Sequence, residues 1–528
     1  MHILSLHNIR LKRDRHLILD NLNQAVHTGE VIGLVGKNGV GKSSLLQVIQ
    51  GYIRPSQGSC ELHGQVWYLP QVHLSLLDSE MTIDQYISQF SDQWWEILEI
   101  TERVYGFDPE VQRSLQSLSG GELMYIHLAL AKHVNPDLLL MDEPTNHIDL
   151  PTQDILRQFI ADFSGAIIIA SHNVAFLDQC VTRIWELDNT NLRTFGENYT
   201  EYRKQIQIEE ASRARKYEVA QKERQRLESA WEQEQHKQRK NMQVEEKNKH
   251  DRSMSRADKG YLKQRAQYKA GKRKDMFSDR FRENQDQLQT YQPSQKKDIR
   301  YRFTSNVHLE GEPIIEVRNG QLRIVDRLLL QNISFQWIYG SRLALLGANG
   351  QGKSVFAQGV AHPHSCLTGE ITRREKARVA YIDQQYSIID PEKTVLDNMR
   401  VLNPEIAETV LRARLGDLSI TQEQIDLEAG LLSGGEVARL AVAMETVEPL
   451  EGLILDEPTN NLDVEGKEAL LSALKKFPGG VLVISHDVDF LQRLGVSHTY
   501  ILGDSTMREV YLSYESDTIW QDILFLMK

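Results

Sequence analysis

Short apolar runs and long polar stretches alternate along the chain, and each predicts a kind of element. The segments VIGLV (31–35), LLLMD (138–142) and GLILD (452–456) are apolar at nearly every position, without the alternation of a half-exposed strand. Such runs are typical of parallel strands covered on both faces. KSSLLQVIQ (42–50), which follows the first run and a glycine-rich loop, predicts a helix. Strands and helices in this order predict an α/β fold with parallel sheets.

The middle of the chain has a different pattern. From Tyr199 to Gln235 there is no Gly or Pro, and strong helix formers predominate. Sparse apolar residues recur at multiples of three and four, and a second set follows later: Tyr199, Tyr202, Ile206, Tyr217, Ala220, Leu227 and Trp231, then Phe277, Phe281, Leu288 and Tyr291. A seam this narrow suits one partner helix but no globular core. It predicts a helical hairpin with roughly 37 residues, ~55 Å, in its first helix.

Length and composition bound the class of protein. The chain has 528 residues, 41% hydrophobic and 25% charged, so it is too long for one core and ordinary for a soluble globular protein. No apolar run reaches the roughly 18–20 residues that span a bilayer, and the N-terminus does not read as a secretory signal. Three cysteines lie far apart, without metal-ligand spacing. We therefore expect a cytoplasmic protein without disulfides or zinc.

Charge is unevenly distributed along the chain. Between Glu201 and Arg300 there are 27 Lys and Arg and 17 Asp and Glu, a net charge of +10. The rest of the chain holds 34 basic and 56 acidic residues, a net charge of −22. Segregation on this scale marks a contact with nucleic acid or a membrane, and the alternative is a solvated charged helix.

The regions on either side of the hairpin repeat one another. Each contains G-x-x-x-x-G-K-S, then LSGGE, then DEPTN after an apolar run, then Ser-His after another. The lysine of the first motif precedes the serine of LSGGE by 77 residues in one copy and 80 in the other. That serine precedes the aspartate of DEPTN by 23 residues in both copies, and the aspartate precedes the histidine by 30. One domain is therefore present twice.

Each motif suits one part of a phosphate-hydrolysing site. A strand, glycine-rich loop and helix turn backbone N–H groups toward phosphate, the lysine reaches the β- and γ-phosphates, and the next serine holds Mg²⁺. The aspartate joins the metal, the following glutamate orients or deprotonates water, and a neutral histidine contacts the γ-phosphate. The residues in these roles are Lys42, Ser43, Asp142, Glu143 and His172 in the first copy, and Lys353, Ser354, Asp456, Glu457 and His486 in the second.

With LSGGE as its most specific motif, the sequence resembles the ATP-binding-cassette (ABC) ATPases. In that family two cassettes face head to tail, and the signature of one completes the ATP site of the other. The resemblance implies that Ser433, Gly434 and Gly435 complete the first site and that Ser119, Gly120 and Gly121 complete the second. It also implies that Gln71 and Gln384 bind the metal. The loops it assigns to ATP are Gly36, Lys37, Asn38, Gly39, Val40, Gly41, Lys42, Ser43 and Ser44, and Gly347, Ala348, Asn349, Gly350, Gln351, Gly352, Lys353, Ser354 and Val355.

The chain departs from the family pattern at three kinds of position. The stretches LKRDRHLILDNL and LRIVDRLLLQNI lack the aromatic residue that stacks on adenine in many cassettes. Arg15, His16 and Arg327 are the candidates to replace it, and weak base discrimination follows. After the signature, Tyr125 stands where the second copy has the usual basic residue, and Asn173 replaces the frequent aspartate after the histidine. These changes predict slower turnover at the second site, which uses the first signature.

Tandem cassettes with a basic insert and no transmembrane segment resemble the ABC-F branch of the family. In that branch the linker enters the tRNA exit site of the ribosome and points toward the peptidyl-transferase centre. The resemblance implies ATP and Mg²⁺ as cofactors, ATP-dependent binding to ribosomal RNA and P-site tRNA, and release on hydrolysis. It also implies cassette pairing within one monomer, with no DNA partner. The long linker resembles antibiotic-resistance members more than housekeeping ones.

These inferences divide the chain into a first cassette (1–197), a basic hairpin linker (198–305) and a second cassette (306–528). Exposed bases and phosphates are expected to meet basic and aromatic residues near the tip of the hairpin. These are Lys249, Arg252, Arg256, Lys259, Tyr261, Lys263, Arg265, Tyr268, Lys269, Lys272, Arg273 and Lys274. The alternatives are an ATPase subunit energising a separate membrane transporter and a DNA-acting cassette protein. The latter resemblance predicts zinc-binding clusters or a very long coiled coil, and neither is in the sequence.

Overall fold

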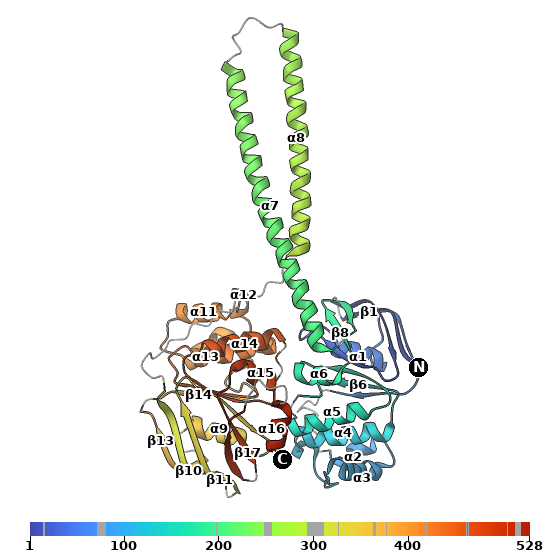
Figure 1. Cartoon of the computed structure of the whole chain (residues 1–528), viewed down its shortest axis with the longest axis vertical. Coiled ribbons are helices and arrows are strands. Elements are labelled where there is room, and N and C mark those ends of the chain that lie inside the picture. Colours follow the sequence, from blue (N-terminus) through green and yellow to red (C-terminus); the bar gives the residue numbers. More distant parts are fainter. Residues whose placement is uncertain are drawn as a thin grey trace. The chain divides into compact units, whose positions relative to one another are not determined.

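A computed structural model of the chain describes residues 1–13, 16–70, 81–146, 148–196, 198–247, 256–292, 311–325, 327–362, 366–375, 377–418, 420–460, 462, 464–503, 505–512 and 519–527. Its described residues form two compact units. One unit joins Met1–Tyr199 with Asp298–Lys528, and the other is Thr200–Lys297. The predicted α/β class, with two tandem cassettes and a long helical hairpin between them in the chain, is confirmed (Figure 1).

The first cassette, β1 to β9, is built on a six-stranded sheet and a three-stranded antiparallel sheet. The six strands lie in the order β5 (Val66–Leu69), β6 (Leu138–Asp142), β7 (Ala166–Ala170), β3 (Val31–Val35), β8 (Arg183–Asp188) and β9 (Asn191–Phe195). The smaller sheet has the order β2 (His16–His27), β1 (His2–Arg13) and β4 (Gln57–Leu62). The helices are α1 (Lys42–Gln50), α2 (Ile83–Ser88), α3 (Trp94–Tyr105), α4 (Gly120–Val134), α5 (Leu150–Asp162) and α6 (Val174–Cys180), with a 3₁₀ turn at Leu115–Ser117.

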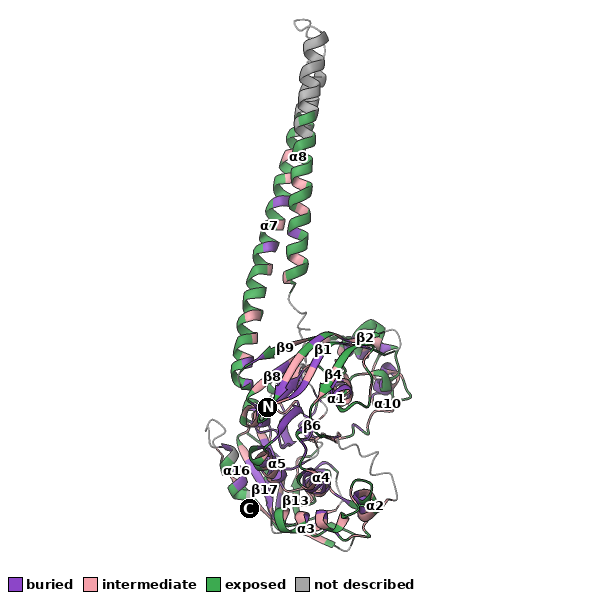
Figure 2. Cartoon of the chain, turned by 90° about the vertical axis from the view of Figure 1, so that its right-hand side faces the viewer, coloured by how far each residue is buried: buried purple, intermediate pink, exposed green. Residues whose placement is uncertain are grey.

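The core explains why the apolar runs form central strands. Every residue of β6 and β7 is buried. In Figure 2 the central strand β6 is purple, whereas the outer strand β4 is mostly exposed. One cluster joins Leu4 of β1, Ile32 of β3 and Leu45 of α1 with the central strands. Because the sheet is covered on both faces, its strands carry no polar alternation. All neighbouring pairs from β5 to β8 are parallel, so their carboxyl ends meet at one edge.

The second cassette, β10 to α16, repeats this architecture. Its six strands lie in the order β14 (Val379–Ile382), β15 (Gly452–Asp456), β16 (Gly480–Ile484), β12 (Arg342–Gly347), β17 (His498–Gly503) and β18 (Thr506–Val510). The three-stranded sheet is β11 (Arg327–Ile338), β10 (Pro313–Ile324) and β13 (Leu367–Arg373). The helices are α9 (Lys353–Ala361), α10 (Val395–Leu402), α11 (Glu408–Asp417), α12 (Gln422–Ile425), α13 (Gly434–Glu445), α14 (Val464–Lys476), α15 (Val488–Leu494) and α16 (Ile519–Met527), with a 3₁₀ turn at Ala429–Leu431.

The hairpin consists of α7 (Tyr199–Lys247, 49 residues) and α8 (Arg256–Tyr291, 36 residues). Its predicted seam is present: the rings of Trp231 and Phe277 lie 5.3 Å apart, and Leu227 is buried. Arg224 stacks over Phe281 at 4.8 Å. Polar contacts add to the seam, since Arg273 pairs with Glu234 at 2.6 Å and Asn284 donates to the Ala220 carbonyl at 2.9 Å. Figure 2 shows the described part of both helices mostly exposed.

The length of the first helix of the hairpin differs from the prediction. The first helix continues to Lys247, so it is ~73 Å long rather than ~55 Å, because no Gly or Pro interrupts the sequence there. Gly260 and Gly271 both lie inside α8 and do not end it. A single glycine costs a helix only ~1 kcal/mol, which its helix-forming neighbours offset. Among the residues that the structure describes, no helix has the length and apolar character needed to cross a bilayer.

Candidate active site

Each phosphate loop ends at a helix whose first turn has a glycine cap. Gly41 caps α1 and Gly352 caps α9, and neither supplies a side chain to the free N–H groups of the first turn. Gly41 has φ 113°, and a Cβ there would lie 2.5 Å from Ile18 Cγ2, so a larger residue would meet both strain and a clash. The uncapped N–H groups and the positive end of the helix dipole therefore remain available to a phosphate chain.

The lysine of each loop is folded back over the loop. Lys42 Nζ donates to the Gly36 carbonyl at 2.9 Å, and Lys353 Nζ donates to the Gly347 carbonyl at 2.7 Å. Both lysines are almost completely buried. An ammonium group held by backbone carbonyls above a helix N-terminus is a suitable receptor for β- and γ-phosphate oxygens.

The signature motif begins a helix in each cassette. Ser119 caps α4 and Ser433 caps α13, each in a capping box with the glutamate of LSGGE, Glu122 or Glu436. This reciprocal pairing gives the final residue of the motif a structural reason. Arg113 also donates to Glu122 at 2.8 Å. The glycines that follow each serine therefore lie at a helix N-terminus, which favours anions.

The two aspartates among the predicted metal ligands lie at the carboxyl ends of β6 and β15. Asp142 Oδ2 accepts from the Tyr68 hydroxyl at 3.2 Å, and Asp456 Oδ2 accepts from the Tyr381 hydroxyl at 2.9 Å. Ser354 also forms a side-chain hydrogen bond with Asp456. The donors are hydroxyl and carboxylate oxygens, which are the hard ligands that Mg²⁺ prefers, so the residues fit this metal. The two tyrosines were missed in the sequence, although each stands three residues before a predicted glutamine.

The glutamate after each aspartate has a strained backbone. Glu143 has φ 48° and Glu457 has φ 47°, in the left-handed region that non-glycine residues rarely adopt. In both cases the amide donates to the end of the neighbouring strand, at Ala170 (2.7 Å) or Ile484 (2.8 Å). Strain repeated at the same place in two copies is typical of a functional position.

Burial sets the protonation state of these glutamates. It raises the pKa of Glu143 to about 7 against the opposing effect of Lys42, and the pKa of Glu457 to about 8 against that of Lys353. Such values suit a general base that exchanges protons near neutral pH.

The paired histidines are neutral. Burial lowers the pKa of His172 to about 3, with a further contribution from Lys42, and lowers that of His486 as well. His172 Nε2 lies 3.3 Å from Glu143 Oε1, and His486 Nε2 lies the same distance from Glu457 Oε1. Because the histidines are neutral, these contacts are not ion pairs. Lys42 Nζ lies 2.9 Å from His172 Nε2. Because an ammonium group can only donate, His172 Nε2 is the acceptor of this hydrogen bond.

A cavity of about 700 Å³ brings residues of both cassettes together. From the predicted sites it contains Asn38, Gly39, Gly41, Lys42, Ser43, Ser44, Asp142, Glu143 and His172, Asn349, Gly350, Gln384, Glu457 and His486, and the signature residues Ser119 and Gly120. The first signature therefore shares a cavity with the second phosphate loop. The second signature, Ser433–Gly435, does not line it.

One hydrogen bond crosses directly from a phosphate loop to the other cassette. The backbone N–H of Asn349 donates to Asp149 Oδ2 at 2.9 Å. The other oxygen, Asp149 Oδ1, caps α5 by accepting from the backbone N–H of Thr152. Asp149 was not among the predicted residues. The signal was present, because an aspartate recurs at the same distance after DEPTN in both copies.

Several predicted residues lie elsewhere or outside the described residues. Gln71, Arg15, Lys249 and Arg252 are outside them, as are the side chains of Arg256, Lys259, Tyr261, Lys263, Arg265 and Lys269. Tyr268 is 73% exposed on α8, and Lys272, Arg273 and Lys274 are exposed beside it. Arg13 and Ile18 line the cavity near the first loop, at the place where an adenine-stacking residue was sought.

Comparison with known proteins agrees with this geometry. The profile of the family described as "ABC transporter" matches residues 19–146 and 330–460, one stretch in each cassette. The chain is 28% identical to "ABC transporter F family member 5" of Arabidopsis thaliana, with 93% of this chain and 73% of the relative covered. It is 27% identical to "Ribosome protection protein VmlR" of Bacillus subtilis strain 168, with 96% and 88% covered.

Among solved structures, the chain resembles an archaeal ribosome recycling factor, aABCE1, in complex with the ribosomal stalk protein aP1. The TM-score is 0.63 at 18% identity, over 98% of this chain and 92% of the other. At this identity the likeness concerns the fold alone. It extends through both cassettes.

Proposed function

Because this chain belongs to the ABC-F family of proteins with two ABC cassettes, we propose that it is an ATP-driven ribosome-binding factor. Two ATP molecules hold the cassettes together across composite sites, and this state presents the linker to the ribosome. The linker then reaches from the tRNA exit site toward the peptidyl-transferase centre, where it relieves a stall or displaces an antibiotic. Hydrolysis separates the cassettes and releases the ribosome.

The site chemistry supports an ATPase. Lys42 and Lys353 exchange their carbonyl partners for phosphate oxygens, and Glu143 and Glu457 accept a proton from the attacking water. The neutral His172 and His486 orient the γ-phosphate. Mg²⁺ would be held by Ser43, Asp142 and Gln71 in the first site and by Ser354, Asp456 and Gln384 in the second, and when bound it neutralises phosphate charge.

The single observation that carries the composite arrangement is the shared cavity. It places Ser119 and Gly120 of the first cassette on the same surface as Asn349, Gly350 and Glu457 of the second. A phosphate chain on the second loop thus faces a helix N-terminus from the other cassette, which attracts it. ATP binding is then favoured by cassette pairing, and by linkage it favours that pairing.

The hairpin supports a nucleic-acid partner. Residues 201–300, which contain most of the hairpin, carry a net charge of +10 in a protein of net charge −12. The basic residues Lys272 and Lys274 of α8 are exposed. Neutralising phosphates by such residues gives binding that weakens steeply with salt. The name of the relative VmlR, a ribosome protection protein, favours the ribosome among nucleic-acid partners. The proposed action on ribosomes is in the cytoplasm.

The double variant Glu143→Gln, Glu457→Gln tests the cycle. It should bind ATP, hydrolyse at least ~100-fold more slowly, sediment with ribosomes and arrest translation, because the clamped state cannot open. The control is Lys42→Ala, Lys353→Ala, which lacks the phosphate-binding ammonium groups and should not sediment with ribosomes. Equal sedimentation of the two variants would contradict ATP gating.

Two further variants test the linker. Lys272→Glu, Lys274→Glu should weaken ribosome binding and reduce its salt dependence, while intrinsic ATPase activity is retained. The matched control is Arg213→Glu, Arg215→Glu, which makes the same charge change on the exposed surface of α7. Equal losses in the two variants would mean that only overall charge matters. Binding to a membrane permease instead of ribosomes would favour the transporter alternative.

A further inference from the structure

One buried pair of side chains is charged in the second cassette and neutral in the first. In the second, Lys467 of α14 pairs with Asp487 at 2.7 Å, and their side chains are only 13% and 10% exposed. In the first, the equivalent positions hold Gln153 of α5 and Asn173, whose carboxamides meet at 3.3 Å. The positions correspond in sequence, because each pair joins the fourth residue after the aspartate of HID or NLD to the residue after the histidine. An ion pair in one cassette thus replaces a neutral pair in the other.

The backbone contacts of the two pairs are alike. Asn173 Oδ1 accepts from the Phe176 amide and Asp487 Oδ1 from the Phe490 amide, both at 3.1 Å, so each residue caps the helix that follows. The backbone N–H of each cap residue donates to a serine hydroxyl at 3.1 Å, Asn173 to Ser171 and Asp487 to Ser485. The two pairs therefore share their backbone contacts and differ in charge and reach, and the second pair also has the Asp489 carboxylate nearby, where the first cassette has Ala175.

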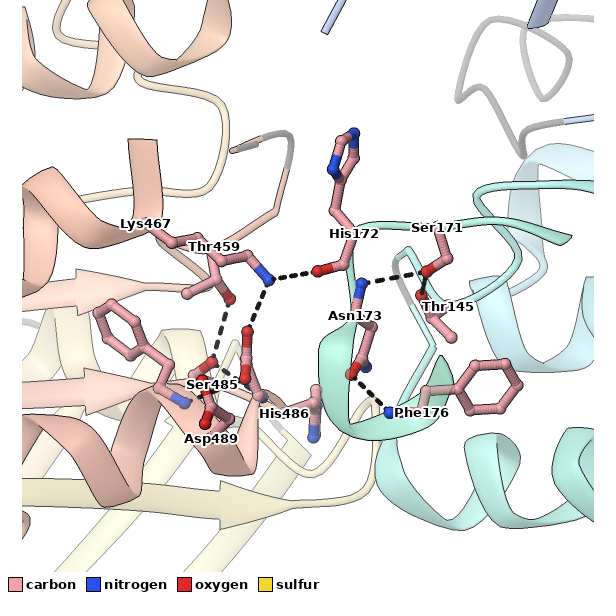
Figure 3. Close-up of polar contacts among 12 residues, drawn as sticks. Thr145, Ser171, His172, Asn173, Phe176, Thr459, Lys467, Ser485, His486 and Asp489 are labelled. Carbon is pink, nitrogen blue, oxygen red and sulfur yellow. Dashed lines mark hydrogen bonds and ion pairs between the residues drawn. The ribbon is translucent and has the colours of Figure 1, made fainter. Parts of the chain in front are cut away.

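Lys467 of the charged pair reaches the other cassette, and among the described residues neither Gln153 nor Asn173 has such a hydrogen bond. Lys467 Nζ also donates to the backbone carbonyl of His172 at 3.2 Å (Figure 3). The side chain of Gln153 is one atom shorter than that of lysine. Its carboxamide nitrogen Nε2 donates within its own cassette, to the Ile148 carbonyl at 3.2 Å. Lys467 is thus fixed by Asp487 in one cassette and bonded to the histidine loop of the other.

That bond lies next to the chemistry of the first site. The His172 amide donates to Glu143 Oε2 at 3.2 Å, and its ring contacts Lys42 and Glu143. A shift of the His172 peptide would therefore move both the ring and the donor that orients the glutamate. Misplacement of about an ångström at such a position is enough to cost up to ~100-fold in rate.

We propose that Lys467, anchored by Asp487, is a positioning residue that makes hydrolysis at the first ATP site depend on the pairing of the two cassettes. The second site, which has the neutral Gln153–Asn173 pair opposite it, is not controlled in this way. The two sites therefore respond unequally to opening and closing of the cassettes. The inference rests on the proposed function, because it requires both sites to hydrolyse ATP.

Exchanging the pairs tests the proposal. Lys467→Gln with Asp487→Asn gives the second cassette the pair that the first already contains, and asparagine still caps the helix. Each site is read separately: a Glu457→Gln background reports the first site, and a Glu143→Gln background reports the second. In the Glu457→Gln background we expect kcat to fall by ~10-fold with KM for ATP within about twofold, since positioning rather than binding is lost.

The conservative control is Lys467→Arg, which keeps the ion pair and a donor, and should retain most of the turnover of the first site. The exchange should lower kcat much less in the Glu143→Gln background than in the Glu457→Gln background. Equal losses in both backgrounds, no loss in either, or a fall caused by KM alone would each overturn the proposal. Absence of turnover in both backgrounds before any exchange would overturn the proposed ATPase cycle itself, and the inference with it.

Discussion

The buried histidine of the signature helix gives a pH prediction that can be worked out in full. His127 lies in α4, is 3% exposed, and shares a hydrogen bond of 2.8 Å with the Tyr86 hydroxyl of α2. Burial lowers its pKa from 6.5 to about 4. The unfolded chain therefore binds a proton more readily than the folded one between these values. Its stabilising contribution is complete above pH 6.5 and is lost as the pH falls toward 4.

The size follows from linkage. Each pKa unit corresponds to 1.36 kcal/mol, so the full difference is ~3 kcal/mol, of which ~2 kcal/mol is already lost at pH 5 relative to pH 7.5. The perturbation is His127→Gln, which cannot be protonated but still offers an acceptor to Tyr86. Between pH 7.5 and pH 5 we expect the free energy of opening of the His127→Gln variant to fall by ~2 kcal/mol less than that of the wild type.

Hydrogen exchange of the α4 amides measures the relevant opening free energy, after correction for the pH dependence of intrinsic exchange. His133→Gln is the matched control, because His133 lies in the last turn of the same helix and is more exposed. The same pH dependence of α4 protection in the wild type and in His127→Gln would refute the reasoning.

Three other predictions follow from particular contacts. Gly271→Ala should stabilise the hairpin by ~0.5–1 kcal/mol, seen as a higher thermal midpoint by circular dichroism, because a Cβ there meets no neighbour within 4 Å. Lys467→Gln alone should lower the free energy of unfolding by ~3–5 kcal/mol, because it leaves Asp487 buried without its cation. Adding Asp487→Asn should recover most of this loss in urea unfolding. Additive effects of the two substitutions would exclude this coupling. GTP should be hydrolysed within roughly tenfold of ATP, because none of the described residues that line the cavity is Phe, Tyr or Trp. Strong preference for ATP in steady-state assays would contradict the last.

The hairpin shows how far pattern reasoning extends and where it stops. The seam residues Trp231 and Phe277 meet as the periodicity predicted, because helical spacing places each on the apolar face of its own helix. The buried Asn284 was not anticipated, since a polar residue in a charged sequence gives no sign of facing inward. Its hydrogen bond to the Ala220 carbonyl depends on the register of the two helices, which only their packing determines.

The order of chemical groups in each cassette is a local property, and the sequence alone determined it. Glycine caps, the lysine after them, and an aspartate and glutamate after a buried strand act through backbone geometry within a few residues, so their spacing sufficed. Tertiary structure decided which groups meet across the cassettes and how they are charged. Lys467 and His172 are 295 residues apart, and Asp149 and Asn349 are 200 apart. Neither contact has a periodic signature, and the pKa shifts of Glu143 and His172 arise from burial, which is a property of the folded chain.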